Sequence, residues 1–104
     1  MGVDRSELEA LISEALVDAY GPDEELTAWS AVLEDALEVP FTTTVLGQEV
    51  TVTKLDFPEH GGVRAVCVAA GHRQRIALTD LPLPDPPPAG AEWVAAYRLW
   101  SGRG

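Results

Sequence analysis

The fold class is decided by the stretch Phe41-Thr-Thr-Thr-Val-Leu-Gly-Gln-Glu-Val-Thr-Val-Thr-Lys-Leu55, in which β-branched residues replace the helical periodicity of the residues before it. The pair Gly47-Gln48 predicts a tight turn, so that the residues on either side form paired antiparallel strands. Two more apolar or β-branched runs follow at residues 63–69 and 74–78. Four short strands joined by tight turns predict a small antiparallel β-barrel of the SH3-like kind.

The residues before this stretch predict a helical hairpin. Apolar residues recur with the spacing of an amphipathic helix from about Glu7 to Tyr20, behind a capping box that begins at Ser6. Gly21-Pro22 ends this helix, and Asp23 is placed to cap a second one, which the next proline stops. The apolar stripe of the second helix consists of Leu26, Trp29, Leu33, Ala36 and Leu37.

The C-terminal third begins with a proline-rich segment, Leu81-Pro-Leu-Pro-Asp-Pro-Pro-Pro88, which predicts polyproline II structure. One interpretation of this segment is a ligand for SH3 or WW domains. We favour the other, a stiff strap that carries the chain back across the barrel. Residues Glu92 to Trp100 then place aromatic side chains at i, i+4 and i+7, which predicts a short helix that docks them on the body.

These elements predict an α+β protein, with an N-terminal helical hairpin packed on a small antiparallel barrel and a short C-terminal helix. The length of 104 residues fits a single domain, residues 1–104, with one core. Within it, residues 1–40 form the acidic helical hairpin, 41–81 the barrel, and 82–104 the strap and the C-terminal helix. Hydrophobic residues make up 46% and charged residues 23% of the chain, which is typical of a protein that folds by itself.

The formal charge of −10 is concentrated in the first third of the chain. Residues 1–39 contain eleven acidic residues and one basic residue, Arg5, whereas residues 40–104 contain six of each kind. Such a negative region repels nucleic-acid phosphates, and Arg73 and Arg75 on one short strand give too small a basic footprint to change this. We therefore expect cations, and not nucleic acid, as partners of the acidic region.

No apolar run reaches the roughly 20 residues of a membrane-spanning helix, and the N-terminus is acidic where a signal peptide is basic and then apolar. We therefore expect a cytoplasmic protein without a membrane partner.

Catalytic and zinc chemistry find little support in the sequence. His60 and His72 each lie in a glycine-rich turn with no obvious partner, and Cys67 is the single cysteine, so neither a catalytic triad nor a zinc site is indicated. A phosphate-binding glycine loop is also missing from the sequence. We expect a protein that is not an enzyme, and the carboxylates remain as the candidate functional groups.

The acidic residues break local rules of helix stability at one place. Glu34 and Glu38 are one turn apart on one helix face, and together with Asp35 they crowd the C-terminal turns, where the helix dipole disfavours anions. Asp18 repeats this arrangement at the end of the first helix. A divalent cation held by oxygen ligands would remove the conflict, although an acidic face that is merely solvated explains the same pattern. No EF-hand loop is present, so a calcium site has to be assembled from separate segments.

A family resemblance supports the cation interpretation. Four pieces of the sequence carry it: Val17-Asp-Ala-Tyr-Gly-Pro-Asp-Glu-Glu25, Trp29, Leu33-Glu-Asp35 and Pro40-Phe41. They resemble the small bacterial calcium-binding protein family first recognised in cyanobacteria. The resemblance implies an acidic helical region packed on a β domain, and calcium sequestration without catalysis. Residues 82–88 and the basic Arg73-Gln-Arg75 depart from the family pattern.

The resemblance makes Asp35 the strongest candidate ligand for Ca²⁺. The supporting candidates are Asp18, Glu24, Glu25 and Glu34, with Asp80 as a contribution from the β region, and the helix pattern adds Glu38. At 100° per residue, Asp35 is rotated away from the apolar stripe that Glu34 flanks, so one helix cannot direct both at a single ion without another segment.

A second hypothesis uses the same features differently. The acidic helical surface, or the small barrel, would then dock a protein partner, and the chain would be a non-catalytic interaction module. The sequence does not identify such a partner.

Overall fold

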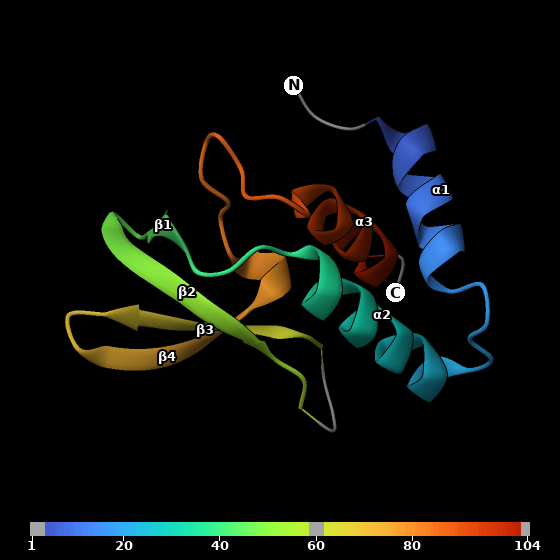
Figure 1. The fold of residues 1–104 in the computed structure, drawn as a ribbon, viewed down its shortest axis with the longest axis horizontal. Coiled ribbons are helices and arrows are strands. Elements are labelled where there is room, and N and C mark those ends of the chain that lie inside the picture. The colour runs from blue at the N-terminus through green and yellow to red at the C-terminus, as the bar shows by residue number, and fades with distance from the viewer. Residues whose placement is uncertain (1–3, 59–61, 103–104) are drawn as a thin grey trace. The chain divides into compact units, whose positions relative to one another are not determined.

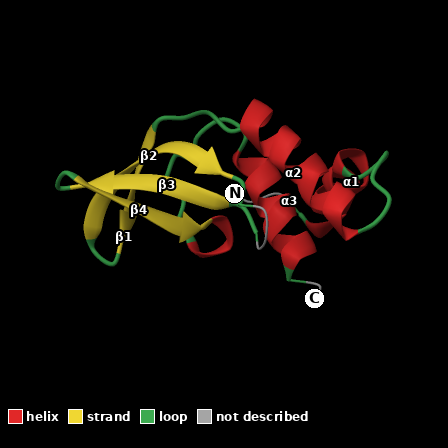
Figure 2. Ribbon diagram, turned by 90° about the horizontal axis from the view of Figure 1, so that it is seen from below, coloured by secondary structure: helices red, strands yellow, loops and turns green. Residues whose placement is uncertain are grey.

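The computed structural model describes residues 4–58 and 62–102 (Figure 1). The elements follow in the order α1, α2, β1, β2, β3, β4, a short 3-10 helix and α3. The chain divides into two compact units, a helical unit (Met1–Leu37 and Gly90–Gly104) and a sheet unit (Glu38–Ala89), and Figure 2 distinguishes their helices from their strands. This content confirms the predicted α+β class.

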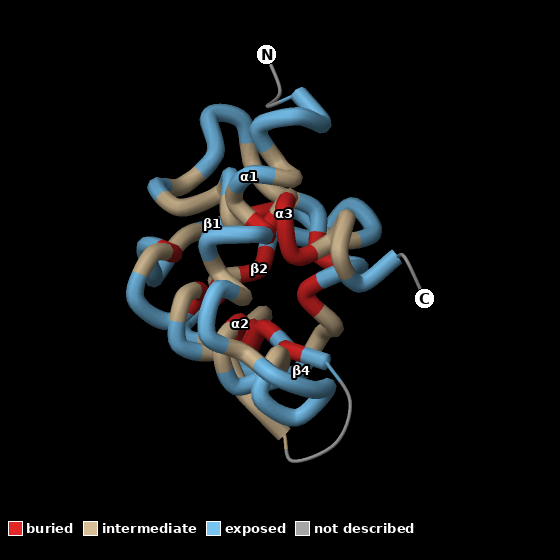
Figure 3. The backbone as a smooth tube through the Cα atoms, turned by 90° about the vertical axis from the view of Figure 1, so that its right-hand side faces the viewer, coloured by how far each residue is buried: buried red, intermediate tan, exposed pale blue. Residues whose placement is uncertain are grey.

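The helical unit contains α1 (Arg5–Ala15), α2 (Pro22–Ala36) and α3 (Ala91–Ser101). Both N-terminal helices pack on α3, and α1 touches α2 only slightly, so α3 belongs to the same core. Trp29 is fully buried and lies edge-on to Tyr97, with ring centroids 5.6 Å apart and an interplanar angle of 72°. The predicted docking of the C-terminal aromatics is thus observed within this unit, and Figure 3 marks the buried positions along the backbone.

The first helix differs from its predicted bounds at both ends. Asp4, and not Ser6, caps it, because the Asp4 carboxylate accepts a hydrogen bond of 2.9 Å from the backbone N–H of Glu7. The helix ends at Ala15, five residues before Tyr20, and a turn follows in which the Ala19 N–H donates to the Leu16 carbonyl. As a result Tyr20, which the helical periodicity placed on the apolar stripe, is 79% exposed, and Val17 in the turn is 70% exposed.

The second helix begins one residue earlier than its predicted cap. Gly21, at φ 100°, takes the N-cap position and Pro22 the first helical position, so Asp23 lies in the first turn and does not cap the helix. A proline suits this position because the first N–H groups of a helix have no partner within it. With 15 residues, α2 is the longest helix of the described ranges.

No helix within residues 4–58 or 62–102 combines the length and the apolar character needed to cross a membrane.

The sheet unit contains four antiparallel strands: β1 (Phe41–Val45), β2 (Gln48–Asp56), β3 (Arg64–Ala69) and β4 (His72–Ala77). Their order in the sheet is β1-β2-β3-β4, so β1 and β4 are the two edges. The predicted SH3-like barrel is therefore wrong, because the sheet is open. Closure requires the first and last strands to pair while all strands tilt steeply around the axis. A simple meander that ends in strands of five and six residues leaves these edges apart.

The proline-rich segment lies against β1. The buried Thr43 hydroxyl donates a hydrogen bond of 2.8 Å to the carbonyl of Pro82, and the preceding Leu81 is fully buried. Farther along, the Ala89 carbonyl accepts a bond of 2.9 Å from the N–H of Glu38, just before β1. These two bonds fix the beginning and the end of the segment beside β1 and the residues before it.

Two-residue turns join β1 to β2 and β3 to β4. The central residues are Leu46-Gly47 and Ala70-Gly71, so the first turn lies one position earlier than predicted. All four residues have positive φ, between 50° and 79°, as in the turns whose twist matches that of antiparallel strands. Leu46 and Ala70 are therefore side-chain-bearing residues in a conformation that favours glycine or asparagine.

Candidate functional site

Five of the seven predicted ligands belong to the helical unit. Asp18, Glu24, Glu34 and Asp35 are exposed and Glu25 is half-buried, and none of their carboxylates forms a hydrogen bond or ion pair within the described part of this unit. The first turn of α2 is acidic and the last turns of α1 and α2 contain no basic residue. The charge of these carboxylates is therefore screened by water and salt and is available to a bound cation.

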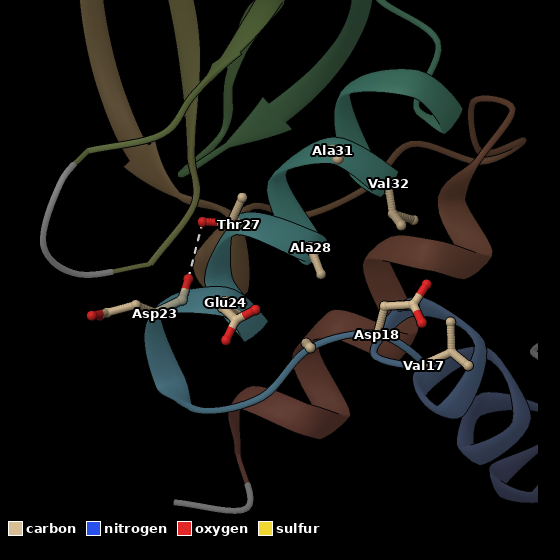
Figure 4. Close-up of a pocket in the computed structure, with 10 residues that line it drawn as sticks. Val17, Asp18, Asp23, Glu24, Thr27, Ala28, Ala31 and Val32 are labelled. Atoms are coloured by element: carbon tan, nitrogen blue, oxygen red, sulfur yellow. Dashed lines mark hydrogen bonds between the residues drawn. The ribbon is translucent and has the colours of Figure 1, made fainter.

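A hollow of about 460 Å³ lies where the segment after α1 passes α2, along the part of that helix from Asp23 to Val32 (Figure 4). We refer to it as the α1–α2 hollow. Its apolar lining consists of Ala15, Val17, Ala19, Ala28, Ala31 and Val32. Its polar lining consists of Asp18, Asp23, Glu24 and Thr27.

Two predicted ligands, Asp18 and Glu24, line this hollow from different segments. Figure 4 shows Asp18 and Val17 on the connecting segment and Glu24 at the beginning of α2, with the Asp23 carboxylate directed outward. The sequence analysis expected any calcium site to be assembled from separate segments, and Asp18 and Glu24 come from two such segments. Because α1 ends at Ala15, Asp18 lies in this connection and not at a helix terminus.

Glu34 and Asp35 lie at the opposite end of α2, in its last turn. From Glu24 to Asp35 the helix rises by about 16 Å, whereas calcium binds oxygen at about 2.3–2.6 Å. Glu24 and Asp35 therefore cannot bind one ion, and the carboxylates of the helical unit form two groups.

The remaining two predicted ligands belong to the sheet unit. Glu38 is exposed in the segment before β1, and Asp80 is the exposed last residue of the 3-10 helix Leu78–Asp80. Both carboxylates are acceptor groups of the kind that calcium prefers.

The donor chemistry of these residues fits calcium, whereas their arrangement supplies only part of a coordination shell. Within each unit, the described residues include no group of three or more His, Cys, Asp or Glu side chains that could hold one metal ion. Calcium takes six to eight oxygen ligands, among which backbone carbonyls and water are common, so a pair of carboxylates supplies part of such a set and not the whole.

Sequence reasoning missed Asp23 and the hollow itself. Asp23 was interpreted as a helix cap, and that role falls to Gly21. The i, i+3, i+4 spacing of Ala28, Ala31 and Val32 marks a second apolar face of α2 in the sequence. It does not show the hollow, which also requires α1 to end at Ala15.

The surroundings of Cys67 and His72 do not favour nucleophilic chemistry. Cys67 is buried on β3, and desolvation raises the pKa of its thiol, which disfavours the reactive thiolate. His72 is exposed at the start of β4, and His60 lies outside the described residues.

The fold and its carboxylates define a small α+β protein with an acidic helical unit and an open four-stranded sheet. A family model described as calcium binding matches residues 9–101, nearly the whole chain. The chain belongs to this calcium-binding family, which confirms the family expected from the sequence resemblance.

A solved structure described as a calcium binding protein in the calcium-binding form is similar in fold. The TM-score is 0.76 at 22% sequence identity, and the match covers 97% of this chain and 93% of the other. A search of curated proteins gave no match.

Proposed function

We propose that the protein binds Ca²⁺ through carboxylates of its acidic helical region and that it acts by binding or buffering the ion, without catalysis. The family match over residues 9–101 carries this proposal. The similar solved structure is itself that of a calcium binding protein. The exposed carboxylates of α2 and of the segment before it add the donor groups that such a function needs.

The two groups of carboxylates have different parts in this proposal. Asp35 is the principal candidate, supported by Glu34, because both anions occupy the helix end where the dipole disfavours them and where a cation relieves the repulsion. Asp18 and Glu24 form the second group, at the α1–α2 hollow. Glu25, Glu38 and Asp80 remain supporting candidates.

Thermal unfolding with and without calcium tests the proposal. A ligand that binds the folded chain alone stabilises it by RT ln(1 + [L]/Kd), about 2.7 kcal/mol at a hundredfold excess over Kd. For a domain of this size, each kcal/mol raises the melting temperature by about 4–8 °C. We expect millimolar calcium to raise the melting temperature well above its value in chelator, and equimolar magnesium to raise it less. Identical melting curves in calcium and in chelator would exclude calcium binding of useful strength.

A further inference from the structure

The α1–α2 hollow combines an apolar floor with an acidic rim. Val17 leaves 70% of its surface exposed beside the hollow, and Ala31 is also exposed. Among the described residues that line it, the charged ones are Asp18, Asp23 and Glu24, and all three are acidic. The hollow therefore offers apolar contact and negative charge to the same occupant.

The apolar floor comes from a face of α2 that its own core does not use. Trp29 and Leu33 are fully buried on one side of the helix, whereas Ala28, Ala31 and Val32 form a second face that lines the hollow. Alanine on this face lets another backbone approach closely, as it does where two helices cross at about 8–10 Å. From Glu24 to Val32 this face is about 12 Å long, which matches roughly two turns of a docked helix.

The charge selects among possible occupants. The chain has a formal charge of −10, and residues 1–39 contain one basic residue, so a second copy or an anionic lipid surface meets like charge at this hollow. A segment with lysine or arginine beside an apolar stripe meets both the apolar floor and the carboxylate rim.

We propose that the α1–α2 hollow docks a cationic amphipathic helix of a protein partner, with its apolar stripe on Ala28, Ala31 and Val17 and its basic side chains against Asp18 and Glu24. Docking of this kind places one apolar side chain of the partner in the hollow and leaves its cationic groups at the solvent edge. The proposed function also offers Asp18 and Glu24 to calcium, so the test is made in chelator, where no calcium competes with the partner for these carboxylates.

The test uses a fluorescently labelled peptide of about five helical turns, built from leucine and lysine in amphipathic order. Fluorescence anisotropy measures its affinity for the intact protein at about 0.15 M salt, where long-range attraction is screened beyond about 8 Å. A peptide of equal composition, with its leucines scattered around the helix, separates docking from charge attraction. We expect the amphipathic peptide to bind at least tenfold more tightly than the scattered one.

Two variants with the same change in charge locate the binding site. Ala31→Lys alters the floor of the hollow, whereas Ala10→Lys alters an exposed position on α1 outside its lining. Both sites are solvent-exposed and helical, so both variants should fold, which circular dichroism verifies. We expect Ala31→Lys to weaken peptide binding at least tenfold, because it places a cationic side chain where the apolar stripe of the peptide would lie. Ala10→Lys should weaken binding by less than about twofold, because it adds the same charge outside the lining and blocks no contact.

Three results would overturn the proposal. Equal binding of the ordered and scattered peptides would reduce the interaction to charge attraction, and equal effects of the two variants would place binding elsewhere. Self-association of the protein, seen by sedimentation and abolished by Ala31→Lys, would assign the hollow to a second copy.

Discussion

Asp35 is the residue on which the proposed calcium site depends most. Its carboxylate is exposed in the last turn of α2, beside Glu34, and forms no hydrogen bond within the described helical unit. The described part of that unit therefore gives no support to a structural role, in which the Asp35 carboxylate would accept hydrogen bonds that stabilise the fold. A role in binding a cation accounts for an anion that otherwise destabilises its helix end.

The variant Asp35→Asn should weaken calcium binding without destabilising the metal-free protein. Asparagine keeps an oxygen ligand but loses the charge that attracts the ion, and removing an anion from a helix C-terminus relieves about 0.3–1 kcal/mol. Urea unfolding of the variant, in calcium and in chelator, measures both effects. The matched control is Glu14→Gln, which removes an exposed acid near the C-terminus of α1 that is not a candidate ligand.

The assignment of Asp35 fails if Asp35→Asn is markedly less stable than the natural sequence in chelator. It also fails if the variant retains the full calcium-dependent gain in stability that the Glu14→Gln control shows.

Gly90 permits a close approach within the helical unit. It has φ 89°, and a Cβ at this position would overlap the carbonyl group of Ala36 at the end of α2. Gly71 has a similar φ of 79°, but a Cβ there would meet open space. The variant Gly71→Ala should therefore lower the free energy of unfolding by about 1–2 kcal/mol, the cost of placing alanine at positive φ. Gly90→Ala should lower it by about 1–3 kcal/mol more, because the new Cβ overlaps Ala36. Urea unfolding of the two variants compares them directly, and equal losses would show that the contact with Ala36 is unimportant.

At the scale of elements, the turn between β1 and β2 carries an avoidable cost. Leu46 adopts φ 50°, a left-handed backbone conformation that costs free energy for a residue with a side chain. Its apolar side chain is also fully exposed to water. The variant Leu46→Asn should stabilise the sheet unit by about 1 kcal/mol, because asparagine adopts this conformation readily. Denaturant unfolding measures the gain. The control is Thr44→Asn, at an exposed strand position, which should lose stability because asparagine is a poor strand residue. A loss at both positions would contradict the turn argument.

The elements themselves were largely predictable from periodicity. All four strands and three helices occur near their predicted places, because the change from helical to alternating spacing at Phe41 is strong. Two features were not predictable in this way. The end of α1 at Ala15 depends on the chain turning to reach α2, and apolar residues continue beyond that end. Whether a meander closes depends on strand tilt, which alternation does not encode, so the open sheet looked like a barrel in the sequence.

The candidate site was predictable in identity and less so in grouping. The acidic residues and the family are visible in the sequence, since the charge imbalance and the pieces around Trp29 are local features. The acidic residues divide into two groups, one at each end of α2, because the helix rises by about 1.5 Å per residue. The sequence alone also allows this division to be predicted. The α1–α2 hollow was not predictable, because it requires α1 to end early and expose Val17.

At the scale of the whole molecule, the charge of −10 is the property that calcium binding would use. Concentrated like charge opposes folding and attracts cations, so ion binding and folding are expected to favour each other. The same charge attracts monovalent and divalent cations alike, and a true site is distinguished by saturation and by selectivity for calcium over magnesium.

Equilibrium dialysis of the metal-free protein against radioactive calcium, at physiological salt and with excess magnesium in a parallel set, tests the central claim most directly. The account predicts saturable calcium binding that survives magnesium competition and weakens in Asp35→Asn, because the flexible oxygen ligands of the acidic region suit calcium better than the smaller, strictly octahedral ion. Calcium binding that never saturates, or that magnesium removes entirely, would mean that the acidic region only gathers counterions, and would contradict the claim.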